Sequence, residues 1–303
     1  MRRALLRAGV AIGAVGAAGL AWGLVEAHAF TLRRVDLEVL PPGGRDLRVL
    51  HVSDLHLRPG QDDKLAFVAS LADLAPDLVV TTGDNFTHPD ALDPLMAAWG
   101  PLLATPGVFV FGSNDYHAPV FKNPFAYLIH GRSETTTKPQ PDLPWQELRD
   151  RMAAGGWQDL THRRTSLEVG GYRLSFRGTD DAHLDRDDYS LVEGPADVTA
   201  DLNVGVTHAP YLRLLDGFTA DGMDLIFAGH THGGQVCVPG YGALVTNCDL
   251  DAARVKGLST HTAGGQTAHL HVSAGLGTSP FAPYRFACRP EATLLTLRPR
   301  SAV

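Results

Sequence analysis

With 44% hydrophobic and 19% charged residues, the chain of 303 residues is long enough for one large core, and it contains no internal repeat or coiled-coil heptad. Its formal net charge is −7, from 33 acidic and 26 basic residues. This balance does not support a nonspecific nucleic-acid surface, and we expect no nucleic-acid partner.

The N-terminus carries a targeting signal. Three arginines within the first seven positions precede an uncharged stretch, residues 8–25, whose length is at the short end for a membrane span. Positive charge before the stretch predicts an N-terminus inside and a main domain outside. We expect residues 1–30 to be a membrane anchor. The alternatives are a signal peptide cleaved after Ala27-His28-Ala29 and a twin-arginine signal.

Five short apolar runs along the chain each end in polar residues of metal-binding type. The runs are Leu47–Val52, Leu78–Thr82, Val108–Phe111, Leu202–Val206 and Leu225–Ala228. The clusters that follow them are Asp54-Leu55-His56, Gly83-Asp84-Asn85, Gly112-Ser113-Asn114-Asp115, Thr207-His208 and Gly229-His230-Thr231-His232. Such runs are typical of buried strands, and α/β sheets place their chemistry at strand ends. The sequence therefore predicts that the clusters meet in one pocket.

The remaining elements complete an α/β pattern. Helices are predicted at Asp63–Leu74, Asp90–Leu103, Trp145–Ala154 and Tyr211–Phe218, and further strands at Ser166–Val169, Tyr172–Arg177, Ala268–Ser273 and Ala292–Leu297. Alternation in the early part implies parallel strands with helices outside, and the closely spaced later strands fit a second sheet packed on the first. The polar, Pro-bearing segment 122–144 is predicted to be a loop, either a lid over the site or a disordered insertion.

The cysteines contribute little to this pattern. Cys237, Cys248 and Cys288 lack Cys-x-x-Cys spacing, which argues against a thiolate zinc site. Free buried thiols are expected, and a Cys237–Cys248 pair across the intervening turn is the alternative for an exported chain.

The clusters combine carboxylate, imidazole and amide oxygen. This ligand set suits Mn, Fe or Zn better than Ca, which prefers oxygen alone. Two ions about 3.5–4 Å apart that share one carboxylate are the usual two-metal hydrolytic arrangement. The sequence therefore predicts two divalent metal ions.

The order Asp-x-His, Gly-Asp, Gly-Asn-like, His and Gly-His-x-His resembles the calcineurin-like metallophosphoesterases, from about Leu47 to Leu297. Gly229–Gln235 resembles the membrane-associated branch that includes the bacterial YaeI and YkuE proteins. The resemblance implies a four-layer α/β/β/α sandwich of two mixed sheets over residues 45–299. It also implies a ligand set: Asp54, His56 and His232 for the first metal, Asp84 as the bridge, and His208, His230 and an asparagine for the second metal.

The third cluster departs from the family pattern, which reads Gly-Asn-His-(Asp/Glu). An ungapped match places Ser113 at the ligand position, whereas a shift of one residue places Asn114 there. We favour Asn114, because an amide oxygen is a better ligand than a neutral hydroxyl. The histidine that helps to protonate the leaving group is missing. Asp115 or His117 is expected to replace it, unless the leaving group needs no acid.

Single residues of these types have ordinary structural explanations. A lone Asp, Asn or His after a strand more often caps a helix or makes a turn than binds metal. Five clusters in the family order make that explanation untenable for the set. It is preferred for Asp180, Asp181 and His183, which we expect in a solvated acidic loop rather than at the rim of the pocket.

The expected function is hydrolysis of phosphodiesters or phosphomonoesters by a hydroxide activated at two Mn, Fe or Zn ions. The N-terminal segment places the enzyme in a bacterial-type cell membrane, as a single-pass protein with its catalytic domain outside the cytoplasm, or makes it secreted if cleaved. A lipid-linked or envelope phosphoester would suit this location. The alternatives are a cyclic-nucleotide phosphodiesterase and a metal-bound binding protein without turnover.

Overall fold

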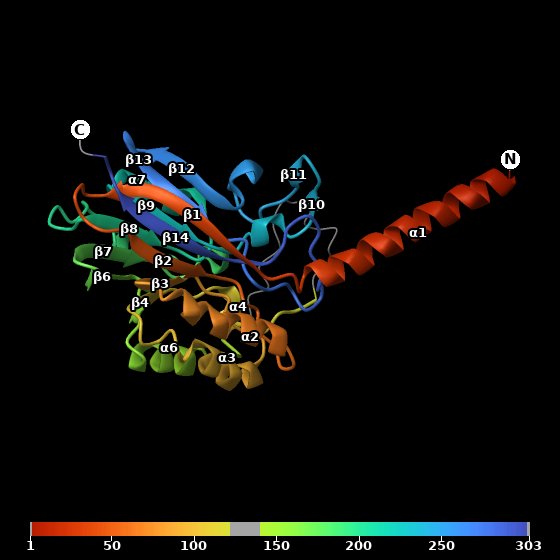
Figure 1. Ribbon diagram of the computed structural model, residues 1–303, viewed down its shortest axis with the longest axis horizontal. Helices are drawn as coiled ribbons and strands as arrows, with labels where there is room; N and C mark the ends of the chain where they lie inside the picture. The colour runs from red at the N-terminus through yellow and green to blue at the C-terminus, as the bar shows by residue number, and fades with distance from the viewer. Residues whose placement is uncertain (1, 122–139, 302–303) are drawn as a thin grey trace.

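The computed structural model describes residues 2–121 and 140–301, with side chains described from residue 13 onward. Most of the predicted loop at 122–144 and the side chains of the first part of the predicted anchor therefore lie outside the described residues. Within the described part, two six-stranded sheets pack face to face between two layers of helices (Figure 1). This is the predicted four-layer α/β/β/α sandwich.

The first sheet has the strand order β1-β14-β2-β3-β4-β5. Its strands are β1 (Thr31–Leu40), β2 (Leu47–Val52), β3 (Leu78–Thr81), β4 (Gly107–Phe109), β5 (Gln158–Asp159) and β14 (Glu291–Pro299). All neighbours are parallel except β14 and β2. The sheet is therefore mixed, and its parallel centre places the ends of β2, β3 and β4 at one edge.

The second sheet has the order β12-β13-β9-β8-β7-β6. Its strands are β6 (Arg163–Val169), β7 (Tyr172–Gly178), β8 (Leu202–Val206), β9 (Leu225–Ala228), β12 (Gly257–Ala263) and β13 (Gln266–Val272). The outer pairs β12–β13 and β6–β7 are antiparallel, while β7, β8, β9 and β13 run parallel. A small separate hairpin joins β10 (Cys237–Val238) and β11 (Gly242–Ala243).

Helices cover both outer faces. The α-helices are α1 (Arg2–Glu26), α2 (Asp62–Ser70), α3 (Leu92–Trp99), α4 (Ser113–Tyr116), α6 (Trp145–Ala154) and α7 (Leu212–Ala220). Short 3₁₀ turns are η1 (Leu71–Leu74), η2 (Pro89–Ala91), η3 (Ala182–Leu184), η4 (Tyr189–Leu191), η5 (His232–Gly234) and η6 (Ala252–Arg254). Helices α2, α3 and α6 pack on the first sheet and α7 on the second, as Figure 1 shows.

The core between the sheets explains why both sheets form. Val49, Val80 and Val108 of the first sheet pack in one apolar cluster with Val204 and Phe227 of the second. These strands are buried on both faces, since helices cover their other sides, and they accordingly contain almost continuous apolar runs. The same runs predicted β2, β8 and β9 residue for residue.

The sequence did not predict β1, because its outer part carries charged residues. Its burial alternates, with Arg33, Arg34 and Glu38 exposed and Leu37, Val39 and Leu40 buried. Parallel pairing with β14 holds it at the edge of the sheet. The first sheet thus begins at Thr31, ahead of residue 45 where the predicted domain starts.

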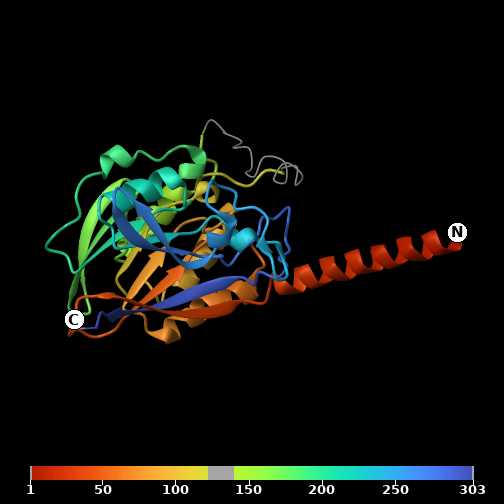
Figure 2. The ribbon, with the colours of Figure 1, turned by 90° about the horizontal axis from the view of Figure 1, so that it is seen from above.

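Helix α1 projects away from the sandwich in both views (Figures 1 and 2). Its last residue, Glu26, is buried, and its carboxylate accepts hydrogen bonds from Trp22 Nε1 at 2.8 Å and from the backbone N–H of Cys288 at 2.7 Å. The base of the helix is therefore fixed to the segment that precedes β14. In the part of the chain whose side chains are described, no helix is long and apolar enough to cross a membrane.

Candidate metal centre

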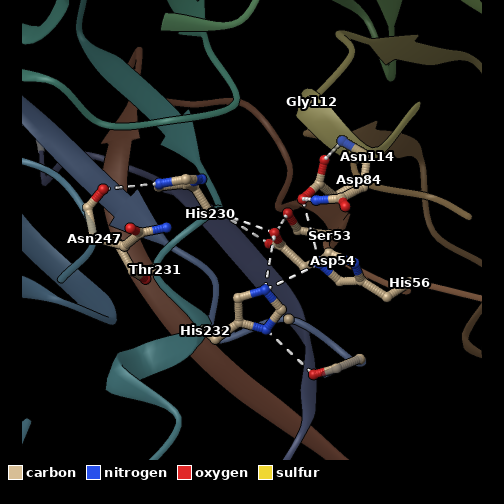
Figure 3. A network of polar contacts seen from close by, with 12 residues as sticks. Ser53, Asp54, His56, Asp84, Gly112, Asn114, His230, Thr231, His232 and Asn247 are labelled. Carbon is tan, nitrogen blue, oxygen red and sulfur yellow. Dashed lines mark hydrogen bonds and ion pairs between the residues drawn. The ribbon is translucent and has the colours of Figure 1, made fainter. Parts of the chain in front are cut away.

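The predicted ligands lie together at the edge where strands of both sheets end (Figure 3). Backbone conformation singles out several of them. A left-handed φ costs an ordinary residue on the order of 1 kcal/mol or more and is concentrated at functional sites. Five of the predicted ligands have it: Asp54 (51°), His56 (44°), Asp84 (54°), His230 (69°) and His232 (50°). The loops thus hold strained turns that aim these side chains into one space.

One group of possible ligands consists of Asp54, His56 and His232. The Nε2 atoms of His56 and His232 face each other at 3.0 Å. Burial lowers the pKa of His56 to about 4 and holds the pKa of His232 well below its usual range. Both rings are therefore neutral at pH 7, which is the form that donates a lone pair to a metal.

A second group consists of Asp54, Asp84 and His208. His230 joins it, since its Nδ1 lies 3.3 Å from Nε2 of His208. The carboxylate of Asp84 stands between the two groups: its Oδ2 is 3.3 Å from Nε2 of His56 and 3.6 Å from Nε2 of His208. This position suits the bridging role that the resemblance implies for Asp84.

The asparagine of the third cluster also reaches Asp84. The backbone N–H of Asn114 donates to Oδ1 of Asp84 at 2.7 Å, and its side-chain amide donates to Oδ2 at 2.8 Å. Ser113 lines the same cavity but interacts with Asn114 rather than with Asp84. Of the two alternatives for this ligand, the geometry favours Asn114.

Carbonyl oxygens orient three of the imidazoles. Nδ1 of His208 contacts the Thr82 carbonyl at 2.6 Å, Nε2 of His230 contacts the Asn247 carbonyl at 3.1 Å, and Nδ1 of His232 contacts the Gly277 carbonyl at 3.2 Å. In a neutral ring, the nitrogen that donates to a carbonyl carries the proton, so the other nitrogen presents its lone pair. In all three rings that other nitrogen faces the cluster. Burial lowers the pKa of His208, but the carboxylates of Asp84, Asp181 and Asp54 outweigh it and raise this pKa to about 9, so that a metal would have to displace one proton from this ring. The chemistry and orientation of the donors therefore fit two metal ions.

The two carboxylates differ in pKa. Burial raises the pKa of Asp54 to about 6, against the opposing effect of His208. Burial acts on Asp84 in the same direction, but the imidazoles of His208 and His56 and the hydrogen bonds from Asn114 outweigh it and hold the Asp84 pKa well below its usual range. Two nearby divalent cations would favour the ionised form of both.

Asp115 does not take the role that we predicted for it. Its buried carboxylate accepts hydrogen bonds from the backbone N–H groups of Asp84 at 2.7 Å, Asn85 at 2.8 Å and Gly112 at 2.9 Å. It is absent from the residues that line the cavity. We therefore assign Asp115 to positioning the Asp84 loop rather than to proton transfer.

His117, the other predicted proton donor, lines the cavity beside the metal cluster. The cavity has a volume of about 260 Å³. Its polar lining includes Asp84, Asn114 and the imidazoles of His56, His230 and His232. Apolar side chains of Val120, Leu184, Val245 and Phe281 also line it.

The prediction for the segment around residue 181 was wrong. Asp180, Asp181 and His183 are buried rather than solvated. His183 lines the cavity, and its ring centroid lies 4.5 Å from that of His230. Asp180 accepts hydrogen bonds from Tyr116 and Arg186 at 2.7 and 2.9 Å. These residues follow the end of a strand, as the five clusters do, and that position was the available signal.

Fold and site together define a metal-dependent hydrolase of phosphoric esters. The sequence model described as calcineurin-like phosphoesterase matches residues 47–234, more than half of the chain. The chain belongs to this family.

Relatives agree with this assignment. Metallophosphoesterase YkuE of Bacillus subtilis is 26% identical over 283 residues, covering 88% of this chain and 85% of the relative. A metallophosphoesterase of Aquifex aeolicus is 24% identical over 276 residues, covering 87% and 89%. Among solved structures, purple acid phosphatase PPD1 from yellow lupin has a TM-score of 0.40 and 13% identity, and the match covers 63% of this chain and 39% of the phosphatase.

Proposed function

We propose that this enzyme hydrolyses phosphoesters whose alcohol is apolar, such as a lipid or lipid-linked envelope ester, at the extracytoplasmic face of a membrane. One observation carries the choice of substrate. Among the described residues, the cavity that contains the candidate metal ligands is lined by no Lys or Arg, while several apolar side chains contribute to its lining. A nucleotide or a polyphosphate would need cations beyond two metals, whereas one phosphoester on an apolar group would not.

Different residues of the site would bind the metals and donate the proton. Asp54, His56 and His232 would hold one metal and His208, His230 and Asn114 the other, with Asp84 between them. When bound, the metals supply an activated water and neutralise charge on the phosphoryl oxygens. His117 faces the same cavity and donates a proton to the leaving alcohol, in place of the histidine that the family usually has next to Asn114.

Two aromatic side chains at the mouth of the cavity, Phe281 and Phe121, reach the protein surface. Phe281 lines the cavity and is 48% exposed, and its ring packs edge-on against Phe121 at 5.7 Å between centroids. Phe121 is 71% exposed. Large exposed aromatic side chains at the mouth of a site are typical of contacts with lipid or another apolar partner.

More exposed apolar side chains lie on the base of α1 and around the hairpin of β10 and β11. The hairpin of β10 and β11 lies next to the base of α1 in Figures 1 and 2. Exposed large apolar residues of these two segments are Leu20, Trp22, Leu24 and Val25 on α1, and Val236, Val238, Tyr241 and Leu244 on the hairpin. We name this set the apolar rim. Its mixture of Trp, Tyr and aliphatic residues suits the boundary between head groups and acyl chains.

The first experiment measures hydrolysis of bis-p-nitrophenyl phosphate and p-nitrophenyl phosphate by the full chain with Mn²⁺, Zn²⁺, Fe²⁺ or EDTA, beside Asp84→Asn. Turnover that requires metal and is lost in the variant is expected. Bound metal without turnover of any ester would favour a binding protein, and preferred turnover of a cyclic nucleotide would overturn the lipid proposal.

A second experiment tests the apolar alcohol. Turnover of a phospholipid in mixed micelles is compared with that of bis-p-nitrophenyl phosphate for Phe281→Ser and for Leu191→Ser, a control at an exposed residue outside the cavity. We expect the ratio of the two activities to fall about tenfold in Phe281→Ser, as loss of one large apolar contact implies. The control should keep the ratio of the unmodified enzyme. Equal ratios in both variants would show that Phe281 does not contribute to the preference for an apolar alcohol.

A further inference from the structure

Two cysteine thiols from distant parts of the chain meet beneath the loop that carries His232. Cys237 begins β10, and Cys288 lies shortly before β14. The backbone joins the two segments, because Val236 and Phe286 form a parallel bridge and the N–H of Cys237 donates to the Phe286 carbonyl at 2.8 Å. Both cysteines are buried and reduced.

The two sulfurs share one acceptor. Sγ of Cys237 contacts the Gly233 carbonyl at 3.2 Å, and Sγ of Cys288 contacts the same oxygen at 3.3 Å. Sγ of Cys288 further contacts the carbonyl of His232 at 3.4 Å. The pair thus packs directly against the backbone of a metal ligand.

The loop that carries His232 is tightly packed against the two sulfurs. Gly233 has a left-handed φ of 61°, and a Cβ built there would lie only 2.8 Å from Sγ of Cys288. Turn η5, which contains His232, Gly233 and Gly234, is therefore held between the metal site and the two sulfurs. A movement of either sulfur must be taken up by this turn.

We propose that Cys237 and Cys288 are a redox-active dithiol, and that a disulfide between them displaces the His232 loop and weakens metal binding. The two sulfurs share the Gly233 carbonyl without being bonded to each other, and a disulfide needs a direct S–S bond of about 2.05 Å. Oxidation also removes both S–H donors from the Gly233 carbonyl. The loop then loses two hydrogen bonds while the sulfurs beneath it move.

The chemistry is thiol–disulfide exchange with a low-molecular-weight disulfide. One cysteine, as its thiolate, displaces half of the small disulfide and forms a mixed disulfide, and the leaving thiolate takes up the proton. The second cysteine then displaces the other half in the same way. One S–S bond breaks and one forms, and two electrons pass from the protein to two small thiols.

Local opening of the hairpin gives the oxidant access. Cys237 is 6% exposed; it pairs with Ala243 within a two-residue strand and donates one further backbone hydrogen bond to Phe286. Its neighbours Val236 and Val238 are 40% and 43% exposed. Two-residue strands share few hydrogen bonds, so we expect this hairpin to open more often than the core strands. Opening uncovers Cys237 without unfolding either sheet.

The test uses the full chain treated with oxidised glutathione and then with dithiothreitol. Free thiols are expected to fall from the 3 cysteines of the chain to one, with a Cys237–Cys288 crosslink in the peptide digest. Metal content is measured after dialysis, and metal affinity is expected to fall about 10- to 100-fold, the usual effect of disturbing the support of a metal ligand. Dithiothreitol should restore both values.

Three single cysteine variants test which thiols form the disulfide. Cys237→Ser and Cys288→Ser should each abolish the crosslink and the loss of metal, while Cys248→Ser should behave as the unmodified chain. If one variant fails to fold, the other still tests the pair. A crosslink to Cys248, three thiols that survive oxidation, or a Cys237–Cys288 disulfide with unchanged metal affinity would each overturn the proposal. Thiol counts and metal content do not depend on turnover. A wrong substrate proposal would therefore leave the result of this redox experiment unchanged.

Discussion

Asp115 and His117 lie two positions apart and face different surroundings. The carboxylate of Asp115 is enclosed by backbone N–H groups of the Asp84 and Gly112 loops, whereas the imidazole of His117 faces the cavity. Burial and the charge of Asp84 raise the pKa of Asp115 to about 7. A residue with such a pKa would suit proton transfer, but its position within hydrogen bonds to the backbone removes it from the substrate.

Asp115→Asn is expected to disrupt the hydrogen bonds that position the Asp84 loop. Either orientation of the amide sets an NH₂ group against backbone N–H donors, so at least one buried donor loses its acceptor. We expect a loss of about 2 kcal/mol in the free energy of unfolding and lower turnover. Denaturant unfolding and a pH–rate profile check this, and a profile that changes shape rather than height would restore Asp115 as an acid.

His117→Ala is expected to affect chemistry and to leave stability almost unchanged. General acid catalysis contributes about 10²–10⁴-fold for an alcohol that is a poor leaving group. p-Nitrophenolate needs no such help. The measurement is kcat for an alkyl ester against kcat for the p-nitrophenyl ester, and an equal loss for the two would contradict proton donation.

At the level of elements, α2 supports the first ligand loop through one buried cation. Lys64 is 4% exposed, and its Nζ donates to the Leu55 carbonyl at 2.7 Å and to Gln61 Oε1 at 3.2 Å. Leu55 lies between the ligands Asp54 and His56. Burial, with the charges of Arg285 and Arg58, lowers the pKa of Lys64 to about 7. The helix therefore holds this loop at an electrostatic cost.

That cost predicts a dependence of stability on pH. Between about pH 7 and the ordinary lysine value of 10.5, the unfolded chain binds a proton that the folded chain does not. The contribution of Lys64 to stability therefore rises with pH across this window, by on the order of a few kcal/mol. Lys64→Met should flatten the curve, as measured by urea unfolding at several pH values. Parallel curves for the two proteins would show that Lys64 titrates normally.

At the scale of the whole molecule, the ligands come from both sheets. Loops after β2, β3 and β4 supply Asp54, His56, Asp84 and Asn114, and loops after β8 and β9 supply His208, His230 and His232. Two metals would thus link the sheets at the edge where buried carboxylates and imidazoles crowd together. Binding to the folded state alone stabilises it.

Removal of metal is expected to lower Tm. At a metal concentration of about 100 times Kd, the stabilisation is about 2.7 kcal/mol per site, which corresponds to roughly 5–10 °C for a chain of this size. Calorimetry with Mn²⁺ or EDTA measures the shift. Asp84→Asn should reduce it strongly, and an equal metal shift in this variant would show that Asp84 is not a shared ligand.

Much of this protein can be predicted from local sequence. Continuous apolar runs predicted β2, β8, β9 and most of the other inner strands, because a strand covered on both faces must be apolar throughout. Polar residues after those runs predicted which side chains meet as candidate metal ligands, because strand ends of one sheet share an edge. The charged edge strand β1 has neither signal, and only pairing with β14 reveals it.

The tertiary structure decided what the same residue types do. Burial turned the acidic segment around Asp181 into part of the cavity wall and enclosed Asp115 in backbone hydrogen bonds, although both looked like solvent-facing or reactive groups in the sequence. It also set Cys237 against Cys288, about 50 positions apart, instead of near Cys248. Sequence alone determined which chemistry the chain carries, since ligand types and strand runs are local. Side-chain surroundings depend on contacts between distant segments, and only the packed sheets fix them.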